Sequence, residues 1–148
     1  MPEVTVVIVD DDEGHVELVR RNLRRSGIHN PIVTLNSGAE ALDYVFCRGA
    51  HAGRTNDGEL LILLDINMPG IDGVEVLRRI KADDKTKSIP VMMLTTTDDP
   101  REINRCYELG CSVYITKPVD PAHFIEAIQR LGLFISVVRT PIDPARLP

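Results

Sequence analysis

Residues 60–65 read Leu-Leu-Ile-Leu-Leu-Asp, five apolar residues followed by an acid. A strand with one face in water alternates apolar and polar residues, whereas an unbroken apolar run is typical of a strand that is buried on both faces. Such strands occur in parallel sheets that carry helices on both sides. This run therefore predicts a central strand of a parallel sheet.

Strand-like and helix-like segments alternate on both sides of this run. Apolar and β-branched residues predict four further strands, at Val4–Val9, Ile32–Leu35, 90–94 and 112–116. Each of the five strands precedes a helical pattern that begins at a capping residue: Asp12, Ser37, Asp72, Asp99 and Asp120. Five consecutive strand–helix pairs predict an α/β fold, a doubly wound five-stranded parallel sheet covered by helices.

The length and composition fit one globular domain. The chain has 148 residues, of which 43% are hydrophobic and 26% are charged, close to the average for soluble domains. We interpret residues 1–138, which hold the five pairs, as that domain. Residues 139–148 form a tail too short to fold alone, so we expect no effector domain and an output through contacts with other proteins.

Charge and cysteine content argue against several classes of protein. There are 17 basic and 22 acidic residues, a net charge of −5, which is unfavourable for general nucleic-acid binding because that binding depends on neutralising phosphates. No apolar run approaches the ~18–20 residues of a membrane span, and the N-terminus lacks the basic flank of a signal peptide. Three cysteines without C-x-x-C spacing predict neither a disulfide framework nor a zinc site. We therefore expect a cytoplasmic protein that contacts neither membrane nor nucleic acid.

Polar residues follow four of the predicted strands. Asp10 and Asp11 end the first strand, Asp65 the third, Thr95 the fourth and Lys117 the fifth. The carboxyl ends of parallel strands share the edge of the sheet where ligands bind, so these side chains are expected to converge. Clustered carboxylates repel one another unless a cation joins them, and oxygen ligands suit Mg²⁺. A carboxylate beside Mg²⁺ can attack a phosphoryl group whose oxygens a lysine and a hydroxyl bind. A single acid at a strand end more often only caps a helix, but the full set favours this chemistry.

The same residues lie in segments that resemble the receiver domain of two-component response regulators. The resemblance covers essentially the whole chain and is carried by Val9-Asp10-Asp11, by residues 64–73 (Leu-Asp-Ile-Asn-Met-Pro-Gly-Ile-Asp-Gly), by Leu94-Thr95-Thr96 and by Thr116-Lys117-Pro118. It implies the (βα)5 receiver fold of flavodoxin-like type. It also implies a signalling protein, phosphorylated by a histidine kinase, that is not an enzyme beyond its own phosphorylation and dephosphorylation.

The resemblance assigns roles around the phosphorylation site. Asp65 is implied as the phosphoacceptor, and Thr95 and Lys117 as the residues that hold the phosphoryl oxygens. Mg²⁺ is the implied cofactor, and its implied protein ligands are Asp11 directly, Asp10 through water, Asp65, and the backbone carbonyl of Asn67.

The resemblance also implies roles beyond the phosphorylation site. Tyr114 falls at the aromatic position that, with Thr95, would report phosphorylation to the face of the fourth helix. The family's proline turn predicts a cis peptide between Lys117 and Pro118. The implied contacts with the kinase are His15, Leu18, Asn22, Pro118 and Val119; the spacing of His15 does not predict a metal ligand.

A narrower resemblance is to the single-domain regulators that work with bacterial phytochromes. It is carried by the long polar segment 48–59, by residues 94–99 (Leu-Thr-Thr-Thr-Asp-Asp) and by the C-terminal extension after Gly132. The expected phosphodonor is therefore a bacteriophytochrome histidine kinase. The run 133–138 is apolar on more than one side of a helix, which predicts a homodimer through this extension, including Phe134 and Val138, and through the neighbouring face of the fourth and fifth helices.

Two alternatives use the same residues differently. One is a Mg²⁺-dependent phosphohydrolase with an aspartate nucleophile, a class that places a second acid two residues after the nucleophile; Asn67 stands there and cannot act as that acid. The other is a pseudo-receiver, a metal-free scaffold, which the intact acids argue against. Mg²⁺ titration separates these alternatives.

Overall fold

The computed structural model describes residues 4–55, 59–118 and 120–130. Its centre is a parallel sheet of five strands in the order β2-β1-β3-β4-β5. The strands are β1 (Val4–Val9), β2 (Ile32–Leu35), β3 (Glu59–Leu64), β4 (Val91–Thr95) and β5 (Val113–Thr116). The predicted fold class is confirmed, and β3, the apolar run, is the middle strand.

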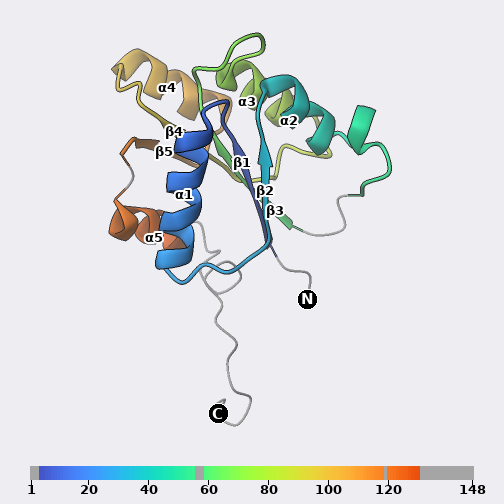
Figure 1. The fold of residues 1–148 in the computed structure, drawn as a ribbon. Helices are drawn as coiled ribbons and strands as arrows, with labels where there is room; N and C mark the ends of the chain where they lie inside the picture. Colours follow the sequence, from blue (N-terminus) through green and yellow to red (C-terminus); the bar gives the residue numbers. More distant parts are fainter. Residues whose placement is uncertain (1–3, 56–58, 119, 131–148) are drawn as a thin grey trace, which may run out of the picture.

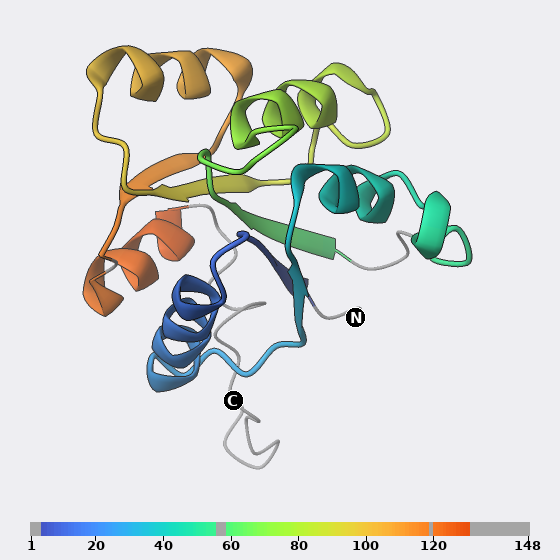
Figure 2. The ribbon, with the colours of Figure 1, turned by 45° about the horizontal axis from the view of Figure 1, so that its top comes forward.

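Helices cover both faces of the sheet (Figure 1). They are α1 (Glu13–Arg25), α2 (Gly38–Val45), α3 (Gly73–Ala82), α4 (Pro100–Leu109) and α5 (Pro121–Arg130). Figure 2 shows α2, α3 and α4 on one face and α1 with α5 on the other. The doubly wound arrangement is therefore as predicted. The extension of the last helix toward residue 138 lies outside the described residues.

Each face of the sheet has its own hydrophobic core. Leu60, Ile62 and Leu64 pack with α2, α3 and α4, whereas Leu61 and Leu63 pack with α1 and α5. Successive side chains of a strand point to opposite faces. Both faces of β3 are buried, which is why the strand needs an apolar residue at every position from 60 to 64.

The predicted capping residues begin the helices. The side chains of Asp12, Ser37, Asp72 and Asp99 accept hydrogen bonds from backbone N–H groups in the first turns of α1, α2, α3 and α4. Gly110 ends α4 with a φ of 109°, a left-handed conformation that favours glycine. These caps fix the helix starts directly after the loops that follow β1, β2, β3 and β4.

Residues 46–55, the described part of the polar segment that follows α2, are more ordered than their sequence predicts. They contain a short 3₁₀-helix, η1 (Gly49–His51). The Arg54 guanidinium lies 3.7 Å from the ring centroid of Tyr44 and donates to the Tyr44 carbonyl at 2.6 Å. This cation–π contact holds the part of the segment that follows η1 against the end of α2.

Among the described residues, β5 is the last strand of the sheet and pairs with β4 alone. The hydroxyl of Tyr107, on α4, accepts a hydrogen bond of 3.1 Å from the backbone N–H of Tyr114 on that strand. Across the part of the chain that the structure describes, every helix falls short of the length and apolar character that crossing a membrane requires.

Candidate phosphorylation site

Strand register brings the predicted site residues together. Val9 of β1 pairs with Leu64 of β3, so Asp10 and Asp65 follow neighbouring strands at the same level. The Asp65 N–H donates to the Val9 carbonyl at 3.0 Å. On the other side, Thr95 pairs with Thr116, and the Lys117 N–H donates to the Thr95 carbonyl at 2.8 Å.

Three acids form a compact cluster at this edge. Carboxylate oxygens of Asp10, Asp11 and Asp65 lie within 4.8 Å of one another. Asp10 and Asp65 are 4% and 7% exposed, whereas Asp11 is open to solvent. Close carboxylates of this kind suit a hard divalent cation with oxygen ligands, so the donor set fits Mg²⁺ or a similar ion.

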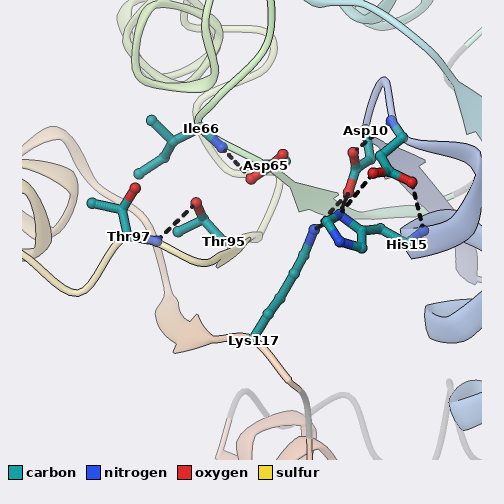
Figure 3. A network of polar contacts seen from close by, with 8 residues as sticks. Asp10, His15, Asp65, Ile66, Thr95, Thr97 and Lys117 are labelled. Atoms are coloured by element: carbon teal, nitrogen blue, oxygen red, sulfur yellow. Dashed lines mark hydrogen bonds and ion pairs between the residues drawn. The ribbon is translucent and has the colours of Figure 1, made fainter.

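Both oxygens of Asp10 have partners within the protein. Oδ1 accepts from the Asp12 N–H at 2.9 Å, and Oδ2 accepts from the Lys117 ammonium at 2.6 Å. Lys117 is itself 9% exposed, so this is a buried ion pair (Figure 3). The carboxylate of Asp11 carries no such partner in the described part of the chain and faces solvent, which makes it the more available ligand.

The surroundings of Asp65 raise the pKa of its carboxyl group. Burial raises the pKa of Asp65 above its ordinary value of 3.8, and the nearby charge of Asp10 raises it further. The ammonium of Lys117 and the hydroxyl of Thr95 act in the opposite direction but do not offset the burial. A cation at the cluster would add to the effect of Lys117 and favour the carboxylate.

The start of α3 lies directly against the Asp65 loop. The Ile66 N–H donates to Asp65 Oδ1 at 2.9 Å, which orients the carboxylate. A Cβ atom on Gly73 would clash with the Asp65 carbonyl oxygen. Only glycine therefore lets the first turn of α3 approach the loop so closely.

A chain of contacts links the site to Tyr114. Asn67 Nδ2 donates to Thr97 Oγ1 at 3.0 Å, and the Tyr114 hydroxyl donates to the Thr97 carbonyl at 2.6 Å. Thr95, fully buried at the end of β4, accepts from the Thr97 N–H at 3.4 Å. Burial raises the pKa of Tyr114 to about 12, so its hydroxyl keeps its proton and acts as a donor.

A hollow of about 220 Å³ opens beside Lys117, between α1 and the loop after β5. Its lining includes four of the residues expected to contact a kinase: His15, Leu18, Asn22 and Pro118. Leu18 in this lining is 50% exposed. The fifth expected residue, Val119, lies outside the described residues.

The sequence matches the response regulator receiver domain over residues 6–129. The chain belongs to the response regulator receiver family. Proteins of this family act in two-component signalling rather than as classical enzymes, partner with histidine kinases, and bind Mg²⁺ or Mn²⁺ at an acidic pocket.

Solved and curated relatives resemble this receiver over nearly its whole length. The solved "Bacteriophytochrome response regulator RtBRR" is 35% identical, with a TM-score of 0.83 over 96% of this chain and 85% of that chain. A response regulator receiver domain from Rhodospirillum rubrum is 46% identical, with a TM-score of 0.73 over 93% and 96% of the two chains. Response regulator Rcp1 from Synechocystis sp. is 31% identical over 90% of this chain and 89% of its own. A solved form of Rcp1 is bound to Mn²⁺; it is 30% identical, with a TM-score of 0.72 over 97% and 99% of the chains.

The structure brings together the predicted residues at the strand ends. Asp10, Asp11, Asp65, Thr95 and Lys117 are brought to one edge, as expected from the strand ends. The peptide between Lys117 and Pro118 is cis, as predicted. Phe134 and Val138 lie outside the described residues. The contact of His15 with Lys117 was not predicted, because residues so far apart in sequence carry no local signal of their proximity.

Proposed function

We propose that this receiver accepts a phosphoryl group from a histidine kinase onto Asp65, in a Mg²⁺-dependent reaction. One observation carries the proposal: Asp65 lies within an acidic cluster that fits a divalent cation, beside the buried ammonium of Lys117. The cluster supplies a nucleophile and metal ligands, and Lys117 supplies a positive charge for the incoming phosphoryl oxygens.

The proposed metal ligands are Asp11, Asp65, Asp10 through water, and the backbone carbonyl of Asn67. The engagement of both Asp10 oxygens by Asp12 and Lys117 supports an indirect role for Asp10. When bound, Mg²⁺ would neutralise charge on the carboxylates and on the phosphoryl oxygens. Rcp1, a relative of this chain, has been solved with Mn²⁺ bound, which supports the proposal that this chain binds a divalent cation.

The proposed reaction moves a phosphoryl group from a kinase histidine to Asp65. A carboxylate oxygen of Asp65 forms the new bond to phosphorus as the phosphorus–nitrogen bond breaks, and the released imidazole takes up a proton. Lys117 and Thr95 hold the phosphoryl oxygens as the transferred charge arrives. The hydrogen bond from Ile66 keeps the other Asp65 oxygen oriented.

The proposed docking surface for the kinase is the hollow beside Lys117. It is lined by His15, Leu18, Asn22 and Pro118, and Val119 adjoins Pro118 in the sequence. The exposed apolar side chains of Leu18 and Pro118, which both line this hollow, support a contact with another protein. This position would bring the donor histidine next to Lys117 and Asp65.

The proposed switch combines Thr95 and Tyr114. Thr95 would turn its hydroxyl to the phosphoryl group, and the adjoining segment would carry Thr97 with it. Because the Tyr114 hydroxyl bonds to the Thr97 carbonyl, a shift of Thr97 would move Tyr114 on the face formed by α4, β5 and α5. The change would reach partners of the receiver as altered protein contacts.

A bacteriophytochrome is the proposed phosphodonor kinase, supported by the likeness to RtBRR.

We also propose a homodimer through the C-terminal extension, with Phe134 and Val138, and the face of α4 and α5. Light scattering should find that the wild-type protein is a dimer at micromolar concentration. The double variant Phe134→Asp, Val138→Asp should be a monomer. A dimer that tolerates both charges would contradict this interface.

The experiment that tests the proposed function is phosphotransfer from a purified bacteriophytochrome kinase, with Mg²⁺ or with a chelator. Wild-type protein should acquire acid-labile label only with Mg²⁺, and Asp65→Asn should acquire none. Asp11→Ala should fold and lose Mg²⁺ affinity. Persistent label on Asp65→Asn, or unchanged Mg²⁺ binding by Asp11→Ala, would contradict the assignments.

A further inference from the structure

The ammonium of Lys117 lies within hydrogen-bonding distance of two groups. Nζ lies 2.6 Å from Asp10 Oδ2 and 3.2 Å from Nδ1 of His15 (Figure 3). A lysine ammonium has three donors and no acceptor. A hydrogen bond between the ammonium and Nδ1 of His15 therefore requires Nδ1 to be the acceptor, with the ring proton on Nε2.

The first turn of α1 fixes the place of His15. Its backbone N–H donates to Oδ1 of the capping residue Asp12 at 3.1 Å, and the Asp12 N–H donates to Asp10 Oδ1 at 2.9 Å. The cap therefore sets the histidine and the first acid of the cluster in one rigid turn. Figure 3 shows the imidazole beside the end of the Lys117 side chain, next to the Asp10 carboxylate.

Two of the three ammonium donors are used by Asp10 and His15, which leaves one. We propose that His15 is a positioning residue: its Nδ1 holds the Lys117 ammonium beside Asp10, so that the remaining donor is free for a phosphoryl oxygen on Asp65. This inference rests on the proposed function. It adds a role within the site itself to a residue expected only to contact the kinase.

The geometry does not favour His15 as a metal ligand. Its Nδ1 is occupied by Lys117 and lies 3.8 Å from carboxylate oxygens of both Asp10 and Asp12. The cluster of potential metal ligands among the described residues consists of aspartates. Loss of the imidazole should therefore change how Lys117 works and leave Mg²⁺ binding as it is.

The test uses acetyl phosphate as a small phosphodonor, so that no kinase surface is involved. His15→Leu removes the acceptor, whereas His15→Asn places an amide oxygen near the position of Nδ1. We expect His15→Leu to be phosphorylated about ten- to a hundredfold more slowly, the range set by losing one hydrogen bond to a charged donor. His15→Asn should stay within about twofold of wild type. His29→Leu, at an exposed histidine outside the site, is the matched control and should equal wild type.

Two further measurements separate positioning from a general structural effect. The Mg²⁺ dissociation constant of His15→Leu should match that of wild type. In long-range ¹H–¹⁵N spectra of wild-type protein, the His15 ring should carry its proton on Nε2, and Lys117→Met should change the Nδ1 resonance. A proton found on Nδ1 would overturn the inference.

The outcomes distinguish this inference from the proposed function. If wild type is labelled and His15→Leu is labelled equally fast, His15 has no positioning role and the proposed function stands. If His15→Asn is as slow as His15→Leu, the acceptor is not what matters and the inference is wrong. If wild type takes no label from either acetyl phosphate or the kinase, the proposed function fails, and the role of His15 fails with it.

Discussion

Replacing Lys117 by methionine should destabilise the metal-free protein strongly. Methionine keeps much of the length of the side chain and removes the charge that pairs with Asp10 at 2.6 Å. Both partners are buried, with exposures of 9% and 4%, and removing one partner of a buried pair costs about 3–5 kcal/mol because the other charge stays behind. Here the remaining charge also lies beside Asp65 and Asp11, which increases the repulsion.

The assay is urea unfolding followed by circular dichroism, with a chelator and then with Mg²⁺. The free energy of unfolding should fall by about 3–5 kcal/mol with the chelator. A second change, Asp10→Asn, should recover most of the loss. Mg²⁺ should stabilise the Lys117→Met variant more than wild type; at a hundred times its dissociation constant a ligand adds about 2.7 kcal/mol.

Lys87→Met is the matched control for the buried pair. Lys87 pairs with Asp84 at 2.9 Å, but the two side chains are 59% and 93% exposed, so the loss should be below about 1 kcal/mol. The view that Lys117 offsets the charge of the buried Asp10 would be refuted by either of two results. One is a loss of stability in Lys117→Met no larger than that in Lys87→Met, and the other is no recovery of stability when Asp10→Asn is added to Lys117→Met.

Three further changes test the site and its support. Asp65→Asn should raise the metal-free unfolding midpoint at neutral pH, and this gain should vanish as pH falls toward 3.8, the ordinary pKa of the carboxyl group. Because the pKa of Asp65 is raised in the folded protein, the stability tied to its protonated form is complete below the ordinary pKa and is lost as pH rises through the raised pKa. A difference between variant and wild type that stays the same across this pH range would contradict the raised pKa. Gly73→Ala should cost about 1–3 kcal/mol through overpacking against the Asp65 carbonyl and should slow phosphorylation; wild-type stability would show that α3 can move away freely. Asp72→Ala should lower the free energy of unfolding by about 1 kcal/mol, because its side chain accepts from the Glu75 N–H at 2.9 Å; a loss below about 0.3 kcal/mol would mean that water replaces the cap.

The sheet and the helix starts could be predicted from the sequence because they depend on local patterns. The apolar run of β3 indicates burial on both faces, and Asp12, Ser37, Asp72 and Asp99 indicate where helices begin. Small differences remain at the ends: β3 begins at Glu59 and β4 extends to Thr95. Propensity does not determine the last ladder hydrogen bond of a strand, which depends on the neighbouring strand.

The convergence of the site was predictable, but its internal contacts were not. Parallel topology alone places Asp10, Asp65 and Lys117 at one edge. The sequence does not indicate that Lys117 pairs with Asp10 or that His15 is its second partner. These contacts depend on side-chain conformations and on backbone positions more than a hundred residues apart. The bond between Asn67 and Thr97 is of the same kind, since two loops must meet before it can form.

The hydrogen bond between Tyr107 and Tyr114 bears on the resistance of this protein to aggregation. A free strand edge offers N–H and C=O groups to any extended segment and is a common starting point for aggregation. β5 is only four residues long, and the hydroxyl of Tyr107 occupies the N–H of Tyr114 within it. An incoming strand would first have to displace that hydroxyl. The short strand and this hydrogen bond therefore make the addition of a further strand at this edge less favourable.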